Sequence, residues 1–421
     1  MECGNWGSLM EESGIGNQES GGVKLKVKAK AAQSVALLEV AKLQDVARTS
    51  SGDKEVDRVL GGGIVEGSLI LLSGEPGVGK STIVARIAAD VASEKKPVLY
   101  ISGEESVGQL AGRFSRITAG ANHVRVLEPF PVETLAATIE KEAPGLAIID
   151  SVQTLTSSEL DATSGSPALV RYATSLLVEV AKRTNVPILL IGQVTKDGSV
   201  AGPKTLEHVV DVVLSLEGDP VHAYRLLRAT KNRFGGTDEV GVFEMTEKGL
   251  TAVENPSARF LEERANVPGS VVTGALEGSR VFLVEVQALV EKTSFGNPVR
   301  RASGFDVSRL QMLCAILSKR AGLKLGEMDV YVNVIGGLTL KEPAADLAVC
   351  AAIMSAHKGT SAEPTVYFGE VGLGGEVRSV SRAPKRLEEA MRLGIEKAVV
   401  PAKTKPHPCI ETQVVSRLSD L

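Results

Sequence analysis

The stretch that decides the fold is residues 69–82, which read LILLSGEPGVGKST. Four apolar residues lead into a segment that fits the pattern GxxxxGK[ST], and a helical pattern of apolar residues follows. Glycines in such a loop let backbone N–H groups surround phosphate oxygens, while the lysine reaches the terminal phosphates and the hydroxyl reaches Mg²⁺. The order strand, loop, helix therefore predicts a site for ATP and Mg²⁺, with Ser81 on the metal ion. The expected binding residues are Gly74, Glu75, Pro76, Gly77, Val78, Gly79, Lys80, Ser81 and Thr82.

Composition limits the class of protein. A chain of 421 residues, 43% of them hydrophobic, is expected to form about two or three domains with ample core. The net charge of −4 gives no general attraction to nucleic acid, so DNA binding would need a local basic patch. The 4 cysteines lie far apart, which predicts a reducing compartment without a disulfide framework. No apolar run reaches the length of a membrane span, and the first residues lack a signal-peptide core, so a soluble intracellular protein without a membrane partner is expected.

Further apolar runs predict a parallel sheet around the first strand. They lie at 98–101, 124–127, 146–149 and 188–191, and helical patterns separate them. Strands that are apolar throughout belong to a sheet covered by helices on both faces, where ligands bind at the carboxyl ends of the strands. The sequence therefore predicts an α/β fold with a P-loop ATPase core.

Polar residues follow these strands at that edge. Asp150 is expected to hold Mg²⁺ through water, although an aspartate here could also cap a helix. Glu104 is the candidate for orienting the attacking water, and Glu105 could take that role instead. Gln193 is placed to sense the terminal phosphate. Lys80, Glu104, Asp150 and Gln193 are thus the expected catalytic residues of this edge.

The order of motifs identifies a family resemblance. The runs GEPGVGKST, YISGEES, LAIIDSVQTL, IGQVTKDG, LEHVVDVVL and KNRFG resemble those of bacterial DNA-repair ATPases of the RadA (Sms) family, which have a RecA-like core, and the likeness covers nearly the whole chain after about residue 46. The resemblance implies a DNA-dependent ATPase that acts as a hexameric ring on single-stranded and branched DNA and promotes branch migration in recombinational repair, with a RecA-type recombinase as partner. It also implies a bacterial cytoplasmic location, or an organelle of bacterial descent. The alternative is a RecA-like ATPase that regulates protein partners without moving on DNA.

The KNRFG motif is expected at an exposed hairpin tip between strands at 224–230 and 240–245. By resemblance, Lys231 and Arg233 would reach a neighbouring subunit's nucleotide or the DNA. Such a tip offers few buried partners, so replacing either cation should change stability by no more than about 0.5 kcal/mol. The motif residues are Lys231, Asn232, Arg233, Phe234 and Gly235.

Composition shifts predict three segments: a flexible tail at 1–43, the ATPase domain at 44–255 and a C-terminal domain at 256–421. Members of the RadA family begin with a four-cysteine zinc ribbon, and Cys3-Gly4-Asn5-Trp6 looks like only its end. Because a single thiol cannot make a four-ligand site, zinc is not expected in this chain.

The C-terminal segment resembles the α+β proteolytic domain of Lon proteases, whose site is a Ser–Lys dyad. The nucleophile region reads Lys341-Glu342-Pro343-Ala344-Ala345, without a hydroxyl, and Pro384 stands nearest the place of the lysine. Acyl transfer needs both groups, so peptidase activity is not expected. The domain is expected instead to serve as a platform for assembly and DNA. Its candidate phosphate contacts are Arg300, Arg301, Lys319, Arg320, Lys324, Arg378, Arg382, Lys385 and Arg386.

Overall fold

The computed structural model describes residues 47–421 except 119, 194–205, 219–223, 248, 295, 337 and 362. The chain separates into the units Met1–Asp45 and Val46–Leu421, and the fold below is that of the second. The predicted tail with Cys3, and the loop that follows Gln193, lie outside the described residues.

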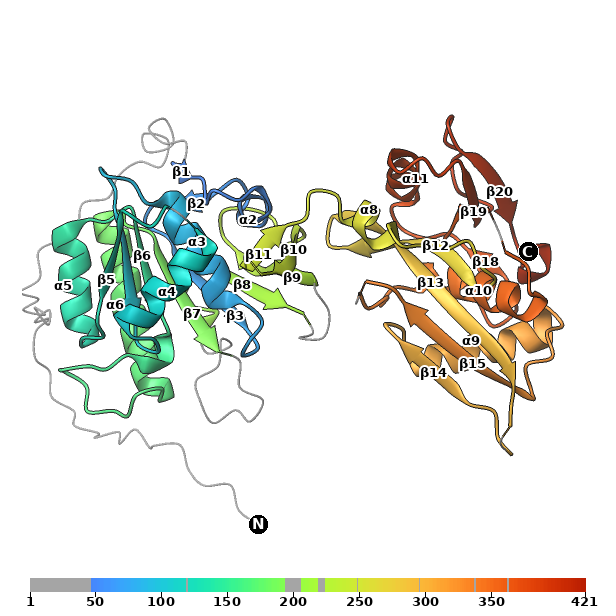
Figure 1. The fold of residues 1–421 in the computed structure, drawn as a ribbon, viewed down its shortest axis with the longest axis horizontal. Helices are drawn as coiled ribbons and strands as arrows, with labels where there is room; N and C mark the ends of the chain where they lie inside the picture. The colour runs from blue at the N-terminus through green and yellow to red at the C-terminus, as the bar shows by residue number, and fades with distance from the viewer. Residues whose placement is uncertain are drawn as a thin grey trace, which may run out of the picture. The chain divides into compact units, whose positions relative to one another are not determined.

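The first sheet has nine strands in the order β11-β10-β9-β8-β3-β7-β6-β4-β5. The strands from β8 to β5 run parallel, and β9, β10 and β11 extend the sheet antiparallel. Figure 1 shows β3 between β7 and β8 in the middle of this sheet. The strands are β3 Leu69–Gly74, β4 Val98–Ser102, β5 Val124–Leu127, β6 Leu146–Asp150, β7 Ile188–Gln193, β8 Val212–Glu217, β9 Tyr224–Asn232, β10 Val240–Thr246 and β11 Gly249–Ala252.

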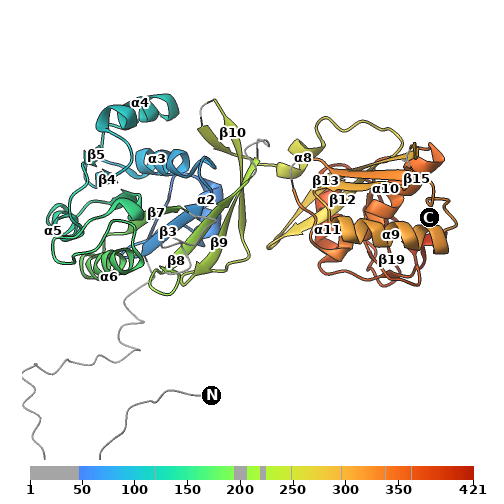
Figure 2. The same cartoon turned by 90° about the horizontal axis from the view of Figure 1, so that it is seen from below.

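Helices cover both faces of this sheet because its central strands are apolar throughout. Side chains alternate along β3, so Leu69 and Leu71 pack with α5 and α6, while Ile70 and Leu72 pack with α2, α3 and α4. Figure 2 shows α3 and α4 on one side of the sheet and α6 on the other. The predicted α/β class with a mainly parallel core is thus confirmed. The helices are α2 Lys54–Leu60, α3 Lys80–Val91, α4 Val107–Ile117, α5 Val132–Glu142 and α6 Pro167–Thr184, with the short pair β1 Arg48–Thr49 and β2 Ile64–Val65 before β3.

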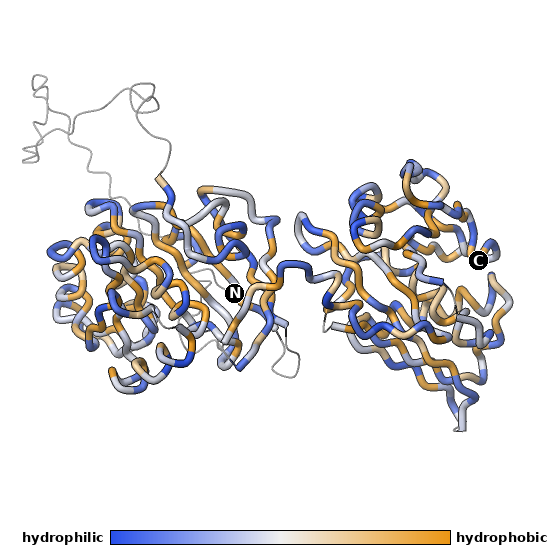
Figure 3. Tube along the Cα trace, turned by 45° about the horizontal axis from the view of Figure 1, so that its top comes forward, coloured by the Kyte–Doolittle hydropathy of each residue, from blue (hydrophilic) through white to orange (hydrophobic). Residues whose placement is uncertain are grey.

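A second, mixed sheet of seven strands follows in the order β14-β15-β13-β12-β16-β19-β20. Helices α9 and α10 pack on one face and α11 on the other. Figure 3 shows hydrophobic residues gathered along the strands of both sheets. The strands are β12 Ser270–Glu277, β13 Arg280–Lys292, β14 Arg300–Ser303, β15 Met328–Val334, β16 Thr365–Tyr367, β19 Lys397–Pro401 and β20 Glu411–Val415, and the helices are α8 Pro256–Leu261, α9 Val307–Arg320, α10 Asp346–Lys358 and α11 Ala383–Arg392.

Short elements complete the fold. The strands β17 Glu370–Val371 and β18 Val377–Arg378 form a separate pair, and three single 3₁₀ turns lie at Val152–Thr154, Pro343–Ala345 and Leu418–Asp420. Within the described ranges, every helix is too short or too polar to cross a membrane.

Candidate functional site

The phosphate loop joins the carboxyl end of β3 to the first residue of α3. Lys80 is 7% exposed, and its Nζ donates to the carbonyl oxygens of Gly74 and Glu75 at 2.8 and 2.9 Å. Burial lowers the pKa of Lys80 from its ordinary value, while the charges of Asp150 and Glu104 act in the opposite direction. The loop therefore holds a cation that two carboxylates at the same edge of the sheet help to keep charged.

Close packing fixes the back of the loop and leaves its front open. Gly79 has φ +112°, and a Cβ there would lie 2.8 Å from Leu250 and 2.9 Å from Met245, so only glycine fits where the β10–β11 hairpin packs on the loop. The buried Arg225 of β9 donates from Nε to the carbonyl oxygen of Val78 at 3.2 Å. A Cβ on Gly77 would meet no atom of the described residues within 4 Å, so this side of the loop is accessible.

Asp150 ends β6 and is fixed by two hydroxyl groups. Tyr100 Oη donates to its Oδ2 at 3.0 Å, and the Ser81 side chain also hydrogen-bonds to the carboxyl group. Burial raises the pKa of Asp150, and these two hydrogen bonds lower it. Tyr100 is fully buried, and its ring meets Phe114 of α4 edge-on at 5.9 Å between centroids. The carboxyl group is thus held between the first turn of α3 and the middle of β4.

Glu104, and not Glu105, faces the neighbouring strand ends. Glu104 Oε1 accepts from Ser151 Oγ at 2.7 Å and from Gln193 Nε2 at 2.9 Å. Glu105 turns instead to an ion pair with Arg113 of α4. The sequence left the choice between the two glutamates open, and this geometry favours Glu104. The structure therefore gathers the predicted Lys80, Ser81, Glu104, Asp150 and Gln193 at one edge of the sheet.

The expectation of a free hairpin tip is wrong for the first two residues of KNRFG. Lys231 and Asn232 are the last residues of β9, because the pairing with β8 continues to Val212 opposite Asn232. Lys231 Nζ donates to the carbonyl oxygens of Glu207 and Val210 at 2.5 and 2.8 Å. Asn232 Nδ2 donates to the last two carbonyls of α2 at 3.4 and 3.2 Å. Both side chains therefore have partners within their own subunit.

Arg233 is the exposed cation of the motif. Its side chain is 56% exposed, and Nη1 lies 3.4 Å from Oδ1 of Asp211, which is 3% exposed. The other oxygen of Asp211 accepts from Lys182 Nζ at 2.8 Å and from the backbone N–H of Leu69 at 3.0 Å. Asp211 consequently keeps partners when Arg233 leaves. Burial lowers the pKa of Lys231, and the nearby charge of Arg233 adds to that shift.

KNRFG and the phosphate loop lie at opposite ends of β3. Asp211, which contacts Arg233, is hydrogen-bonded to Leu69 at the amino end of the strand, whereas the phosphate loop begins at Gly74. A strand of 6 residues spans about 17–20 Å. Arg233 therefore lies away from the phosphate loop of its own subunit.

The structure corrects two of the expected phosphate contacts in residues 256–421, Arg386 of α11 and Arg300 of β14. Arg386 has no exposed side-chain surface and contacts both oxygens of Glu342, at 2.8 and 2.6 Å. Arg300 donates to the carbonyl oxygens of Val299 and Leu325 at 2.9 and 2.7 Å. Both guanidinium groups therefore donate to acceptors within the fold, the carboxylate of Glu342 for Arg386 and backbone carbonyl oxygens for Arg300. Ala344 and Ala345, where the nucleophile was looked for, are each 2% exposed.

Sequence reasoning missed Tyr100, Ser151, Asp211 and Arg225. Tyr100 and Asp211 each interrupt an apolar run, at VLYIS and VVDVV. A polar group inside such a run must find a partner when it is buried, and this signal could have marked both. Ser151 stands beside Asp150 at the strand end, but its contact with Glu104 spans 47 positions, and the contact of Arg225 with Val78 spans 147, so no local signal predicts either contact.

Comparison with known proteins places the chain. A family model described as an AAA domain matches residues 37–199. The DNA repair protein RadA of Halalkalibacterium halodurans is 46% identical over 403 residues, covering 95% of this chain and 88% of the relative. The RadA of Bacillus subtilis is 43% identical, with the same coverage, and that of Campylobacter jejuni is 41% identical, covering 100% of this chain and 94% of the relative. The chain belongs to the RadA family.

The predicted family resemblance is thereby confirmed. A RadA-family chain with an AAA-type domain is, in coarse terms, an ATPase of a family of DNA-repair proteins. Among solved structures, that of the RadB recombinase matches with a TM-score of 0.40 and 24% identity, covering 49% of this chain and 99% of the other.

Proposed function

We propose that this chain is an ATP-driven motor that binds single-stranded DNA and promotes branch migration of recombination intermediates, as a homo-hexameric ring that works with a RecA-type recombinase. Residues 44–255 would form the motor, and 256–421 a Lon-like platform that is inactive as a peptidase. The exposed cations that remain for DNA phosphates on this platform are Arg301, Lys319, Arg320, Lys324, Arg378, Arg382 and Lys385.

The residues of the candidate site fit ATP and Mg²⁺. The open face at Gly77 admits phosphates to the loop, and the hydroxyl of Ser81 and the carboxyl group of Asp150 are oxygen ligands of the kind that Mg²⁺ prefers. Among the described residues, no group of three or more His, Cys, Asp or Glu side chains could hold a metal ion unaided. This agrees with a Mg²⁺ ion held largely by the phosphates. When bound, Mg²⁺ would neutralise charge that develops on them.

The chain's own residues would act by position and charge. Lys80 would exchange its two carbonyl contacts for β- and γ-phosphate oxygens, which a cation binds more strongly than it binds neutral carbonyls. Glu104 would hold the attacking water. Gln193, hydrogen-bonded to Glu104, would report the state of the terminal phosphate to the residues that follow β7.

The observation that carries the proposal is the separation of the two halves of the site along β3. Arg233 is exposed near the end of β3 that is opposite its own phosphate loop, and its ion pair among the described residues is with Asp211. A cation supplied by a neighbouring subunit can raise turnover about 10³–10⁵-fold. In a ring, Arg233 of one subunit would act in this way on the nucleotide of the next. The same exposed position also suits a DNA phosphate.

The test is ATP hydrolysis measured with and without single-stranded DNA, followed by branch migration on a labelled four-way junction. Lys80→Ala should abolish turnover in both conditions, while Lys96→Ala, which removes an exposed lysine that pairs with Glu66, serves as the matched control. Hydrolysis that DNA does not stimulate, with junctions left intact, would favour the alternative of an ATPase that regulates protein partners. Light scattering with and without nucleotide measures the ring.

A further inference from the structure

One turn of the C-terminal sheet contacts the loop that carries Arg233. The turn Gly278-Ser279-Arg280 joins β12 to β13, and the loop runs from the end of β9 at Asn232 to the start of β10 at Val240. A Cβ on Gly278 would lie 2.0 Å from the carbonyl oxygen of Asp238, so the two backbones touch there. Any side chain at this position would force the turn and the loop apart.

Hydrogen bonds join the same two segments. The backbone N–H of Ser279 donates to the carbonyl oxygen of Asp238, and Ser279 Oγ donates to Glu239 Oε1 at 2.5 Å. Arg280 Nη1 donates to the carbonyl oxygen of Val240 at 2.9 Å. The turn therefore holds the C-terminal end of the loop by backbone and side-chain contacts.

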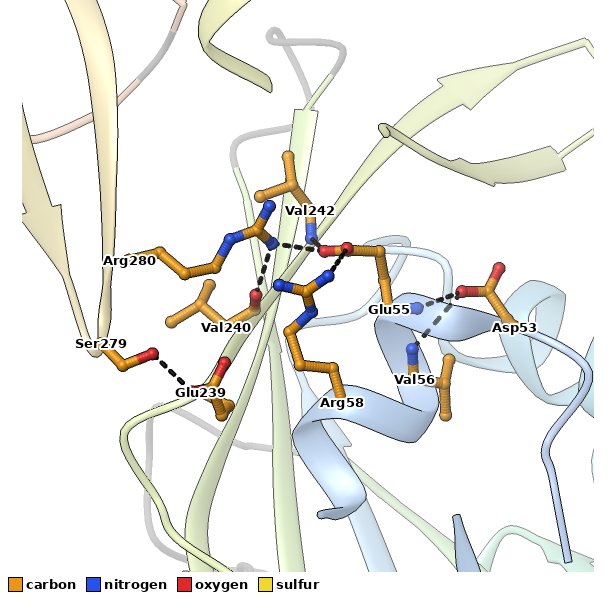
Figure 4. Close-up of polar contacts among 9 residues, drawn as sticks. All are labelled: Asp53, Glu55, Val56, Arg58, Glu239, Val240, Val242, Ser279 and Arg280. Carbon is orange, nitrogen blue, oxygen red and sulfur yellow. Dashed lines mark hydrogen bonds and ion pairs between the residues drawn. The ribbon is translucent and has the colours of Figure 1, made fainter. Parts of the chain in front are cut away.

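Arg280 also reaches helix α2, as Figure 4 shows. Its Nη1 lies 2.5 Å from Glu55 Oε2, which also accepts from the backbone N–H of Val242 at 3.1 Å, while Arg58 lies 3.2 Å from the other oxygen. Glu55 is 5% exposed and Arg280 16%. Two guanidinium groups and a backbone amide face this buried carboxylate, so the removal of one guanidinium disturbs the whole cluster.

The opposite end of α2 holds the N-terminal end of the loop. Asn232 Nδ2 binds the last two carbonyls of the helix, and a Cβ on Gly235 would lie 3.1 Å from the Cα atom of Gly61, which ends the helix. Asp53 caps the start of helix α2, and its carboxylate accepts from two backbone N–H groups of the first turn. This short capped helix thus connects Glu55 to the backbone beside Arg233.

We propose that the Gly278–Arg280 turn positions the Arg233 loop, both by direct contact and through α2, so that Glu55 and Arg280 are positioning residues for the DNA-stimulated hydrolysis. Both routes start in the C-terminal sheet and end at the two sides of Arg233. The C-terminal domain thereby sets where this cation points. This inference rests on the proposed function for its link to turnover, but the positioning itself can be measured without any activity.

The experiment compares two variants of the full chain that each lose an arginine in contact with strand β10: Arg280 contacts Val240 at its start, and Arg259, which also pairs with Glu262, contacts Glu244 farther along. Arg280→Gln removes the cation at the loop end. Arg259→Gln is the matched control, because Arg259 of α8 lies 3.2 Å from Glu244, on the part of β10 away from the loop. Arg280→Lys keeps the charge and tests rescue. Deuterium uptake is measured on peptides that cover α2, residues 230–240 and the phosphate loop, and ATP turnover is measured with and without single-stranded DNA.

Arg280→Gln should raise deuterium uptake in residues 230–240 and α2 but not in the phosphate loop, and should lower the ratio of DNA-stimulated to basal turnover by about fivefold or more, the range of a typical coupling between sites. Arg259→Gln should change neither, and Arg280→Lys should restore both. Equal effects of Arg280→Gln and Arg259→Gln would show that any lost contact between the two sheets has this result, and they would overturn the proposal. Unchanged deuterium uptake in residues 230–240 would overturn it too. Raised uptake with an unchanged turnover ratio would overturn the link to hydrolysis. If DNA does not stimulate the wild type, the proposed function fails, and the uptake data still decide the positioning.

Discussion

Replacing Tyr100 by phenylalanine removes the hydroxyl group that donates a hydrogen bond to the Asp150 carboxyl group. The edge-on packing of the ring against Phe114 stays in place. A hydrogen bond to a charged group contributes about 1.5–3 kcal/mol, which corresponds to roughly one to two pKa units when it favours only the ionised form. Burial already raises the pKa of Asp150, and the loss of this donor raises it further. Because Mg²⁺ needs the carboxylate, the acid limb of the turnover profile should move to higher pH and the Mg²⁺ requirement should increase.

The raised pKa of Asp150 also makes the stability of the folded protein depend on pH. The pKa of Asp150 in the fold lies above its unfolded value, so the folded protein binds more protons between the two values and loses stability as pH rises through that interval. Tyr100→Phe widens the interval, and without nucleotide the variant should lose more stability than the wild type between acidic and neutral pH.

The assay is steady-state ATP hydrolysis titrated with Mg²⁺ at several pH values, beside thermal unfolding of the nucleotide-free protein. Tyr172→Phe is the control, because the Tyr172 hydroxyl also donates to a carboxylate, Glu159, at 2.9 Å, but at the surface of α6. That hydrogen bond raises the pKa of Tyr172 to about 12 without involving the candidate site. The reasoning is refuted if Tyr100→Phe has the acid limb and the Mg²⁺ midpoint of the wild type.

Two further expectations concern stability and activity elsewhere. Lys231→Ala should lower the free energy of chemical unfolding by about 1–3 kcal/mol because two turn carbonyls lose their donor. Arg233→Ala should lower it by less than about 1 kcal/mol because its carboxylate partner keeps a second cation. Equal losses would contradict this. Purified protein should not cleave casein, and cleavage that a substitution in residues 256–421 abolishes would show a working peptidase. Arg386→Met should lower the free energy of unfolding by about 3–5 kcal/mol because Glu342 loses its buried cation.

The parts of the fold that the sequence predicted are those with local signals. The apolar run before Gly74 and the helical pattern after Lys80 are complete within a few residues, and the apolar runs of β4, β5, β6 and β7 are equally local, whereas β8 was not predicted. Asp150 and Glu104 were placed because parallel strands bring their carboxyl ends to one edge.

The partners of Lys231 could not be predicted because they depend on a register. Pairing of β8 with β9 continues one residue past Lys231 and brings it beside carbonyls more than twenty positions earlier in the chain. The burial of Arg386, which was predicted to be exposed, also depends on a distant partner, since Glu342 lies 44 positions earlier in the chain. Exposure and ion pairing of long cations are properties of the assembled fold, and composition does not specify them.

The placement of Arg233 and Lys80 at opposite ends of β3 has a consequence in genetic terms. If the nucleotide of one subunit meets the cation of the next, a subunit without Lys80 still donates a competent Arg233, and one without Arg233 still has a competent phosphate loop. Mixed rings of the two inactive proteins would then contain interfaces with both groups intact. Two null alleles of the same gene would complement each other in one cell, which a site completed within a single chain does not allow.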